Sequence, residues 1–200
     1  MNHKFRLGIT GGIGSGKTSV GRVFNVLGIP VFSADETARE IMESDQNIIE
    51  NVNALAGRNM YTDGYLDRKA LAGMIFNDSN LLVKINNIVH PVVRGKFIKW
   101  SEQQESDYVI LEAAILFESG TYKILDRIIT VIAPMEERIE RVVKRNNLTR
   151  EQVLDRIRNQ SDDDFKIPRS YYVINNSDNE MIIPAVIKIH NDITEYLNKR

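Results

Sequence analysis

The sequence predicts an alternating α/β fold in which a parallel five-stranded sheet lies between helices as a three-layer core. Two observations predict it. First, the apolar run 5–10 leads into a glycine-rich stretch and then into a helical pattern. Second, short runs rich in β-branched residues alternate with helical segments, as buried parallel strands do, and they are too short to favour buried helices. The strand-like runs are 5–10, 30–33, 108–111, 127–132 and 171–174.

The glycine-rich stretch matches the pattern G-x-x-x-x-G-K-[ST] between a predicted strand and a predicted helix. Glycines allow several N–H groups to turn inward and hold phosphate oxygens at the helix N-terminus. Lys17 can reach the β- and γ-phosphates, and the Thr18 hydroxyl can bind Mg²⁺. A chance glycine turn is the alternative, but the strand-to-helix context disfavours it. The predicted nucleotide ligands are Gly11, Gly12, Ile13, Gly14, Ser15, Gly16, Lys17 and Thr18, and Thr18 is also the predicted metal ligand.

Helical periodicity dominates the chain after the second strand. The first helix, 18–27, closes at Gly28, and no strand is expected between residues 36 and 100. Pro91 should kink or divide the last helix of this region. The expected helical segments are 36–43, 47–56, 67–76 and 78–100, with a turn at 61–65.

A second insertion, 135–165, is helical and rich in arginine, and an amphipathic helix over 181–197 closes the chain. The two insertions and the glycine stretch all follow strands. Ligands of open parallel sheets bind beyond the carboxyl ends of the strands. We therefore expect one site at this edge, formed by all three segments.

Composition restricts the partners. The 200 residues carry a net charge of −1, so neither nucleic acid nor a membrane is an expected partner. They contain no cysteine, so neither a disulfide nor a thiolate metal site is expected. No apolar run is long enough to cross a bilayer, and no secretory leader is recognisable. We expect a cytoplasmic protein, either a monomer or a weak homo-oligomer.

Some charged residues have two interpretations. Asp35 follows the second strand and can act as the general base for a hydroxyl that attacks a γ-phosphate, or it can cap the next helix. Arg141 and Arg145 lie four residues apart and can converge on one anion, although charged helices are usually solvated. His90 is more simply explained as a buried or capping histidine.

Several spaced motifs together resemble the dephospho-CoA kinase family over nearly the whole chain. The opening 7–18 is similar to that family's glycine loop, and 34–39 to its D-x-x-A-[RH] substrate motif. Further similarity lies in its substrate-side helices, its L-L-F-E segment, its lid and its final strand. The corresponding segments are 63–68, 90–91, 115–118, 145–160 and 173–176.

The resemblance implies a core of phosphate-loop kinase type formed by 1–34, 106–136 and 168–200, a helical CoA-substrate domain, 35–105, and a lid, 137–167. It implies transfer of the ATP γ-phosphate to the ribose 3′-hydroxyl of dephospho-CoA, with ATP and Mg²⁺ bound. The implied catalytic residues are Asp35, Lys17, Arg141 and Arg145, and Asn176 would lie near the adenine. The implied substrate residues are Thr10, Asp35, Ala38, Arg39, His90, Arg94 and Leu116.

Two positions depart from the family pattern. Ala114 replaces a usual proline, and Asp178 replaces a common glycine.

Another small-molecule or nucleoside-monophosphate kinase is the alternative function. A GTP-dependent switch is disfavoured, because no [NT]-K-x-D element follows a late strand.

Overall fold

The computed structural model describes residues 4–199, except for the side chains of residues 76, 77 and 79. The chain forms two compact units. One contains the residues up to Ser33 and from Trp100 onward, and the other is Ala34–Lys99.

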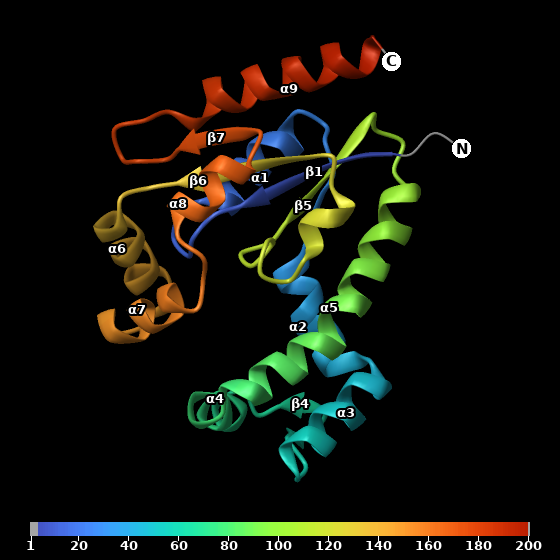
Figure 1. Cartoon of the computed structure of the whole chain (residues 1–200), viewed down its shortest axis with the longest axis vertical. Helices are drawn as coiled ribbons and strands as arrows, with labels where there is room; N and C mark the ends of the chain where they lie inside the picture. The colour runs from blue at the N-terminus through green and yellow to red at the C-terminus, as the bar shows by residue number, and fades with distance from the viewer. Residues whose placement is uncertain (1–3, 200) are drawn as a thin grey trace. The chain divides into compact units, whose positions relative to one another are not determined.

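The first unit is built on the predicted parallel sheet, which is confirmed. Its strands are adjacent in the order β2-β5-β1-β6-β7, and every pair is parallel. In this order β1 is the middle strand, and all six of its residues are buried. The strands are β1 (Phe5–Thr10), β2 (Val31–Ser33), β5 (Tyr108–Glu112), β6 (Arg127–Ile132) and β7 (Tyr172–Asn175). Figure 1 labels β1, β5, β6 and β7.

The two faces of the sheet are covered differently. Helices α1 (Lys17–Val26) and α9 (Ile182–Asn198) share a core with the strands on one face. The alternate residues of β1, Arg6 and Gly8, point to the opposite face of the sheet. On that face the Arg6 Nε donates to the Ser101 hydroxyl at 3.1 Å, and Leu116 and Leu125 lie against Gly8.

The predicted arginine-rich insertion is helical. Helices α6 (Met135–Asn146) and α7 (Arg150–Arg158) pack through Ile139, Val142 and Val153. The Arg150 guanidinium also donates two hydrogen bonds of 2.7 Å to Glu136. Three short helices complete this unit, namely η1 (Thr121–Ile124), α8 (Asp163–Lys166) and η2 (Ile167–Arg169).

The second unit is helical apart from one hairpin. Its helices are α2 (Ala34–Ser44), α3 (Gln46–Ala56), α4 (Arg68–Asn77) and α5 (Ser79–Glu102), whose last turn belongs to the first unit. Helix α5 is not divided at Pro91, which lies inside it.

The expectation of no strand in this region was wrong. Strands β3 (Tyr61–Thr62) and β4 (Tyr65–Leu66) form a hairpin across the predicted turn. Asp63 and Gly64 both adopt positive φ, at 52° and 83°, which is the conformation of a tight Asp-Gly hairpin turn. In the part of the chain that the structure describes, no helix combines the length and apolarity needed to span a membrane.

Candidate active site

The glycine loop between β1 and α1 has the conformation that its sequence predicts. Gly14 and Gly16 have φ values of 79° and 94°, which side-chain-bearing residues rarely adopt. Both also approach other segments too closely for a side chain. An added Cβ would meet the Arg138 main chain at Gly14 and the Asn176 amide at Gly16. The loop is therefore enclosed by α6 and by the segment after β7.

Lys17 lies across this loop. Its side chain is buried, with 8% exposed, and its Nζ donates to the carbonyl oxygens of Gly11 and Gly12 at 3.0 and 3.2 Å. The charge is thus held beside the inward-turned main chain, at the N-terminus of α1. A phosphate placed there meets a fixed cation and the positive end of a helix.

Thr18 and Glu112 form an oxygen-rich pair next to Lys17. The Thr18 hydroxyl donates to the Glu112 carboxylate at 2.7 Å. Glu112 ends β5, and in the sheet register it pairs with Ile9 of β1 and Ser33 of β2. A hydroxyl and a carboxylate are the hard oxygen donors that Mg²⁺ prefers, and this ion keeps most of its ligands as water and phosphate. The pair fits a magnesium site, although no group of three or more metal-binding side chains of the His, Asp and Glu types occurs in the described residues.

Arg138, which is not among the site residues predicted from the sequence, supports the loop from the other side. Its guanidinium is buried, with Nε donating to the Ile13 carbonyl at 3.1 Å and Nη1 lying 3.6 Å from Asp163. The Ile13 N–H donates to the Gln160 side chain at 2.8 Å. In sequence Arg138 is one of many arginines in a charged helix, and only its spacing of three from Arg141 distinguishes it.

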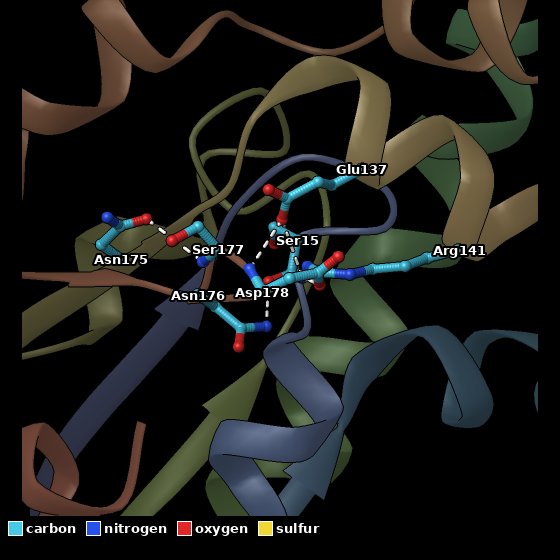
Figure 2. A network of polar contacts seen from close by, with 7 residues as sticks. All are labelled: Ser15, Glu137, Arg141, Asn175, Asn176, Ser177 and Asp178. Atoms are coloured by element: carbon cyan, nitrogen blue, oxygen red, sulfur yellow. Dashed lines mark hydrogen bonds and ion pairs between the residues drawn. The ribbon is translucent and has the colours of Figure 1, made fainter. Parts of the chain in front are cut away.

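Figure 2 shows a polar network between the loop, α6 and the segment after β7. The Asn176 Nδ2 donates to the Ser15 carbonyl at 2.8 Å, so Asn176 anchors the loop. Arg141 contacts Glu137 and Asp178, at 3.0 and 2.5 Å.

Arg145 does not share these contacts. Its Nε donates to the Asn146 side chain at 2.9 Å, and Arg145 is exposed. The structure therefore places Arg141, and not Arg145, in the network around the glycine loop.

Two buried side-chain oxygen atoms in or directly before the glycine loop have no hydrogen-bond partner. Among the described residues, the buried side-chain atoms without such a partner are Thr10 Oγ1, Ser15 Oγ, Arg141 Nη1 and Lys166 Nζ. The first two lie in the glycine loop or directly before it. Burial lowers the pKa of Lys166, while Glu118 and Asp163 oppose that shift and Arg138 adds to it. Buried polar groups are normally paired, so the loop has the unmatched donors expected of an anion site.

The second unit brings together a different set of predicted residues. Asp35 lies exposed in the first turn of α2, with Ala38 and Arg39 following on the same helix. Burial lowers the pKa of His90, the positive charge of Arg94 lowers it further, and the Asp35 carboxylate opposes both effects. Asp35, His90 and Arg94 are therefore electrostatic neighbours.

Leu116, a predicted substrate residue, lies in the interior of the first unit. Its side chain is fully buried and lies against Gly8 of β1. Its carbonyl accepts from the Tyr122 N–H at 3.2 Å. Leu116 thus supports the middle of the sheet.

A parallel sheet carrying this loop, with a buried lysine and a Thr–Glu pair, defines the class of phosphate-loop kinases. The fold is similar to that of shikimate kinase from Acinetobacter baumannii, with a TM-score of 0.54 and 15% identity over 96% of this chain and 93% of that one. The family model of dephospho-CoA kinase matches residues 5–181, and the chain belongs to that family.

Individual proteins are also similar to this chain over most of its length. The chain is 38% identical to dephospho-CoA kinase of Bacteroides fragilis over 185 residues, which cover 92% of this chain and 90% of the relative. A Thermus thermophilus protein of known crystal structure matches with a TM-score of 0.83 and 34% identity, over 98% of this chain and 99% of that one.

Proposed function

We propose that the protein transfers the γ-phosphoryl group of ATP to the ribose 3′-hydroxyl of dephospho-CoA, giving CoA and ADP. Family membership over residues 5–181 carries this proposal, and the glycine loop with its buried Lys17 supports it. The alternative, another small-molecule kinase, is favoured by no contact of the described residues.

The loop residues would bind and orient the triphosphate. Main-chain N–H groups from Gly11 to Thr18 would hold phosphate oxygens, and Lys17 would exchange its carbonyl contacts for the β- and γ-phosphates. Because the ammonium is already desolvated and fixed, it can stabilise charge that develops during transfer without reorganisation. Thr18 and Glu112 would hold Mg²⁺, which neutralises phosphate charge when it is bound.

The acceptor side would depend on Asp35. As the 3′-hydroxyl oxygen forms its bond to the γ-phosphorus, the bond from that phosphorus to the β–γ bridging oxygen breaks and ADP leaves. The hydroxyl proton would pass to the Asp35 carboxylate. The neighbours of this carboxylate, His90 and Arg94, are basic side chains, so neither adds negative charge beside it. Ala38, Arg39, His90 and Arg94 would then orient the acceptor.

The arginine-rich insertion would complete the site as a lid. Arg141 and Arg145 would contact phosphate, and Asn176 would lie near the adenine while it holds Ser15. Water excluded in this way cannot take the phosphoryl group in place of the acceptor. The cytoplasmic location and the monomeric or weakly oligomeric state stay predictions.

An acceptor panel tests the proposal. Purified protein is incubated with MgATP and, separately, dephospho-CoA, adenosine, shikimate or nucleoside monophosphates, and products are identified by mass spectrometry, with ³¹P NMR to place the new phosphate. We expect dephospho-CoA to be the best acceptor and the product to carry a 3′-phosphate. If dephospho-CoA ranks among the poorest acceptors while another is phosphorylated, the proposed substrate is wrong.

A further inference from the structure

One nitrogen of the Arg141 guanidinium is shared by two carboxylates (Figure 2). Its Nη2 lies 3.0 Å from the Glu137 Oε2 and 2.5 Å from the Asp178 Oδ1. The same Glu137 oxygen accepts from the Asp178 main-chain N–H at 2.9 Å. Glu137 and Arg141 are on α6 and Asp178 is on the segment after β7, so this contact joins two distant parts of the chain.

The shared guanidinium lies in the polar network of the glycine loop. Asn176, two residues before Asp178, donates to the Ser15 carbonyl at 2.8 Å, and its own N–H donates to Ile132 at the end of β6. One turn earlier on α6, Arg138 donates to the Ile13 carbonyl. Both sides of the Arg141 contact are therefore fixed to the loop that would hold the triphosphate.

The cluster of Glu137, Arg141 and Asp178 carries more negative than positive charge, and one of its hydrogen-bond donors is unpaired. Two carboxylates and one guanidinium give a net charge of −1 beside an anion site. The Arg141 Nη1 is buried and has no hydrogen-bond partner, while the Asp178 side chain is 69% exposed. A guanidinium binds two oxygens of one phosphate with its planar fork of donors. A phosphate would thus use the unmatched Nη1, and the released Asp178 would be solvated where it already lies.

We infer that Asp178 competes with the nucleotide phosphates for Arg141 and thereby lowers the affinity of the protein for ATP. This rests on the proposed function, because ATP is the anion concerned. Glu137 belongs to the same helix as Arg141 and can stay bound to it when the guanidinium turns. Asp178 belongs to another segment, so its contact is the one that a nucleotide would replace.

A double-mutant cycle separates this competition from a general change in charge. The dissociation constant of MgATP is measured by calorimetry for the native protein, Asp178→Asn, Arg141→Met and the double variant. We expect Asp178→Asn to bind MgATP about fivefold more tightly, which equals about 1 kcal/mol. In the Arg141→Met background the same change should alter affinity less than about twofold, because nothing is left to compete for.

Further variants test whether the effect depends on the carboxylate at position 178 and not on the net charge of the protein. Asp178→Ser should behave as Asp178→Asn, and Asp178→Glu should restore affinity toward the native value. Glu195→Gln removes one negative charge from the exposed pair that Glu195 of α9 forms with Lys199, directly after that helix, and it should leave the dissociation constant unchanged. Thermal unfolding of each variant confirms that the comparison is between folded proteins.

Two results would overturn the inference. The first is an equal gain in MgATP affinity in the native and Arg141→Met backgrounds, which would mean that Asp178 acts only through its negative charge and not through its contact with Arg141. The second is weaker MgATP binding by Asp178→Asn, which would mean that Asp178 positions Arg141 for the nucleotide. Either result leaves the proposed function intact. Failure of the folded native protein to bind MgATP would instead reject the proposed function itself.

Discussion

Replacing Arg138 by methionine tests whether the first turn of α6 holds the glycine loop in shape. Methionine keeps an apolar stem of similar length, so the change removes mainly the guanidinium. The native group donates to the Ile13 carbonyl at 3.1 Å and lies 3.6 Å from a carboxylate oxygen of Asp163. The Ile13 carbonyl would lose this donor.

The expected magnitude follows from burial. A hydrogen bond from a charged group contributes about 1.5–3 kcal/mol, and Arg138 is only 7% exposed. The long contact to Asp163, whose side chain is 28% exposed, adds at most about 1 kcal/mol. We therefore expect the free energy of unfolding to fall by about 2–3 kcal/mol, and the affinity for MgATP to fall by about tenfold as the loop relaxes.

Urea unfolding followed by circular dichroism, together with calorimetry of MgATP binding, measures both effects. Arg158→Met is the matched control, because Arg158 pairs with Asp155 on the surface with 74% of its side chain exposed. We expect that control to change stability by no more than about 0.5 kcal/mol. Equal stability and equal affinity of the two variants would refute the role given to Arg138.

Three further predictions address charge and proton transfer. Lys17→Ala should lower kcat by at least about a hundredfold with the fold retained, since a fixed cation is lost from the phosphate site; steady-state kinetics and circular dichroism test this. Asp35→Asn should lower kcat far more than it weakens ATP binding, and a nearly unchanged kcat would return Asp35 to a purely structural role at the start of α2. The pKa of His90 is depressed, so the neutral form is favoured in the folded protein, and the free energy of unfolding should fall as the pH drops below about 6.5. In His90→Asn that decline should be shallower, and an unchanged profile would show that His90 does not contribute to it.

The fold was accessible from the sequence because its signals are local. Buried parallel strands are short and β-branched, and the glycine loop needs positive φ at fixed positions, as Gly14 and Gly16 have. The hairpin around Asp63 was missed although Asp-Gly is a hairpin signal, because strands of two residues carry too little hydrophobic alternation to be recognised.

The contacts that shape the loop were less accessible, because they join distant parts of the chain. Arg138 contacts Ile13 across 125 positions, and Thr18 contacts Glu112 across 94. Periodicity marks Arg138 only as a charged helical residue, and it marks Glu112 only as the end of a strand. The pairing of Arg141 with Asp178 likewise depends on the sheet order, which places β6 beside β7.

Calorimetric titration with MgATP tests the central claim most directly, because every proposed role depends on triphosphate binding at the glycine loop. Folded native protein should bind one MgATP per chain, and Lys17→Ala should bind it much more weakly. Heat absent from the native titration, or identical binding by Lys17→Ala, would contradict the assignment of this loop as the phosphate site.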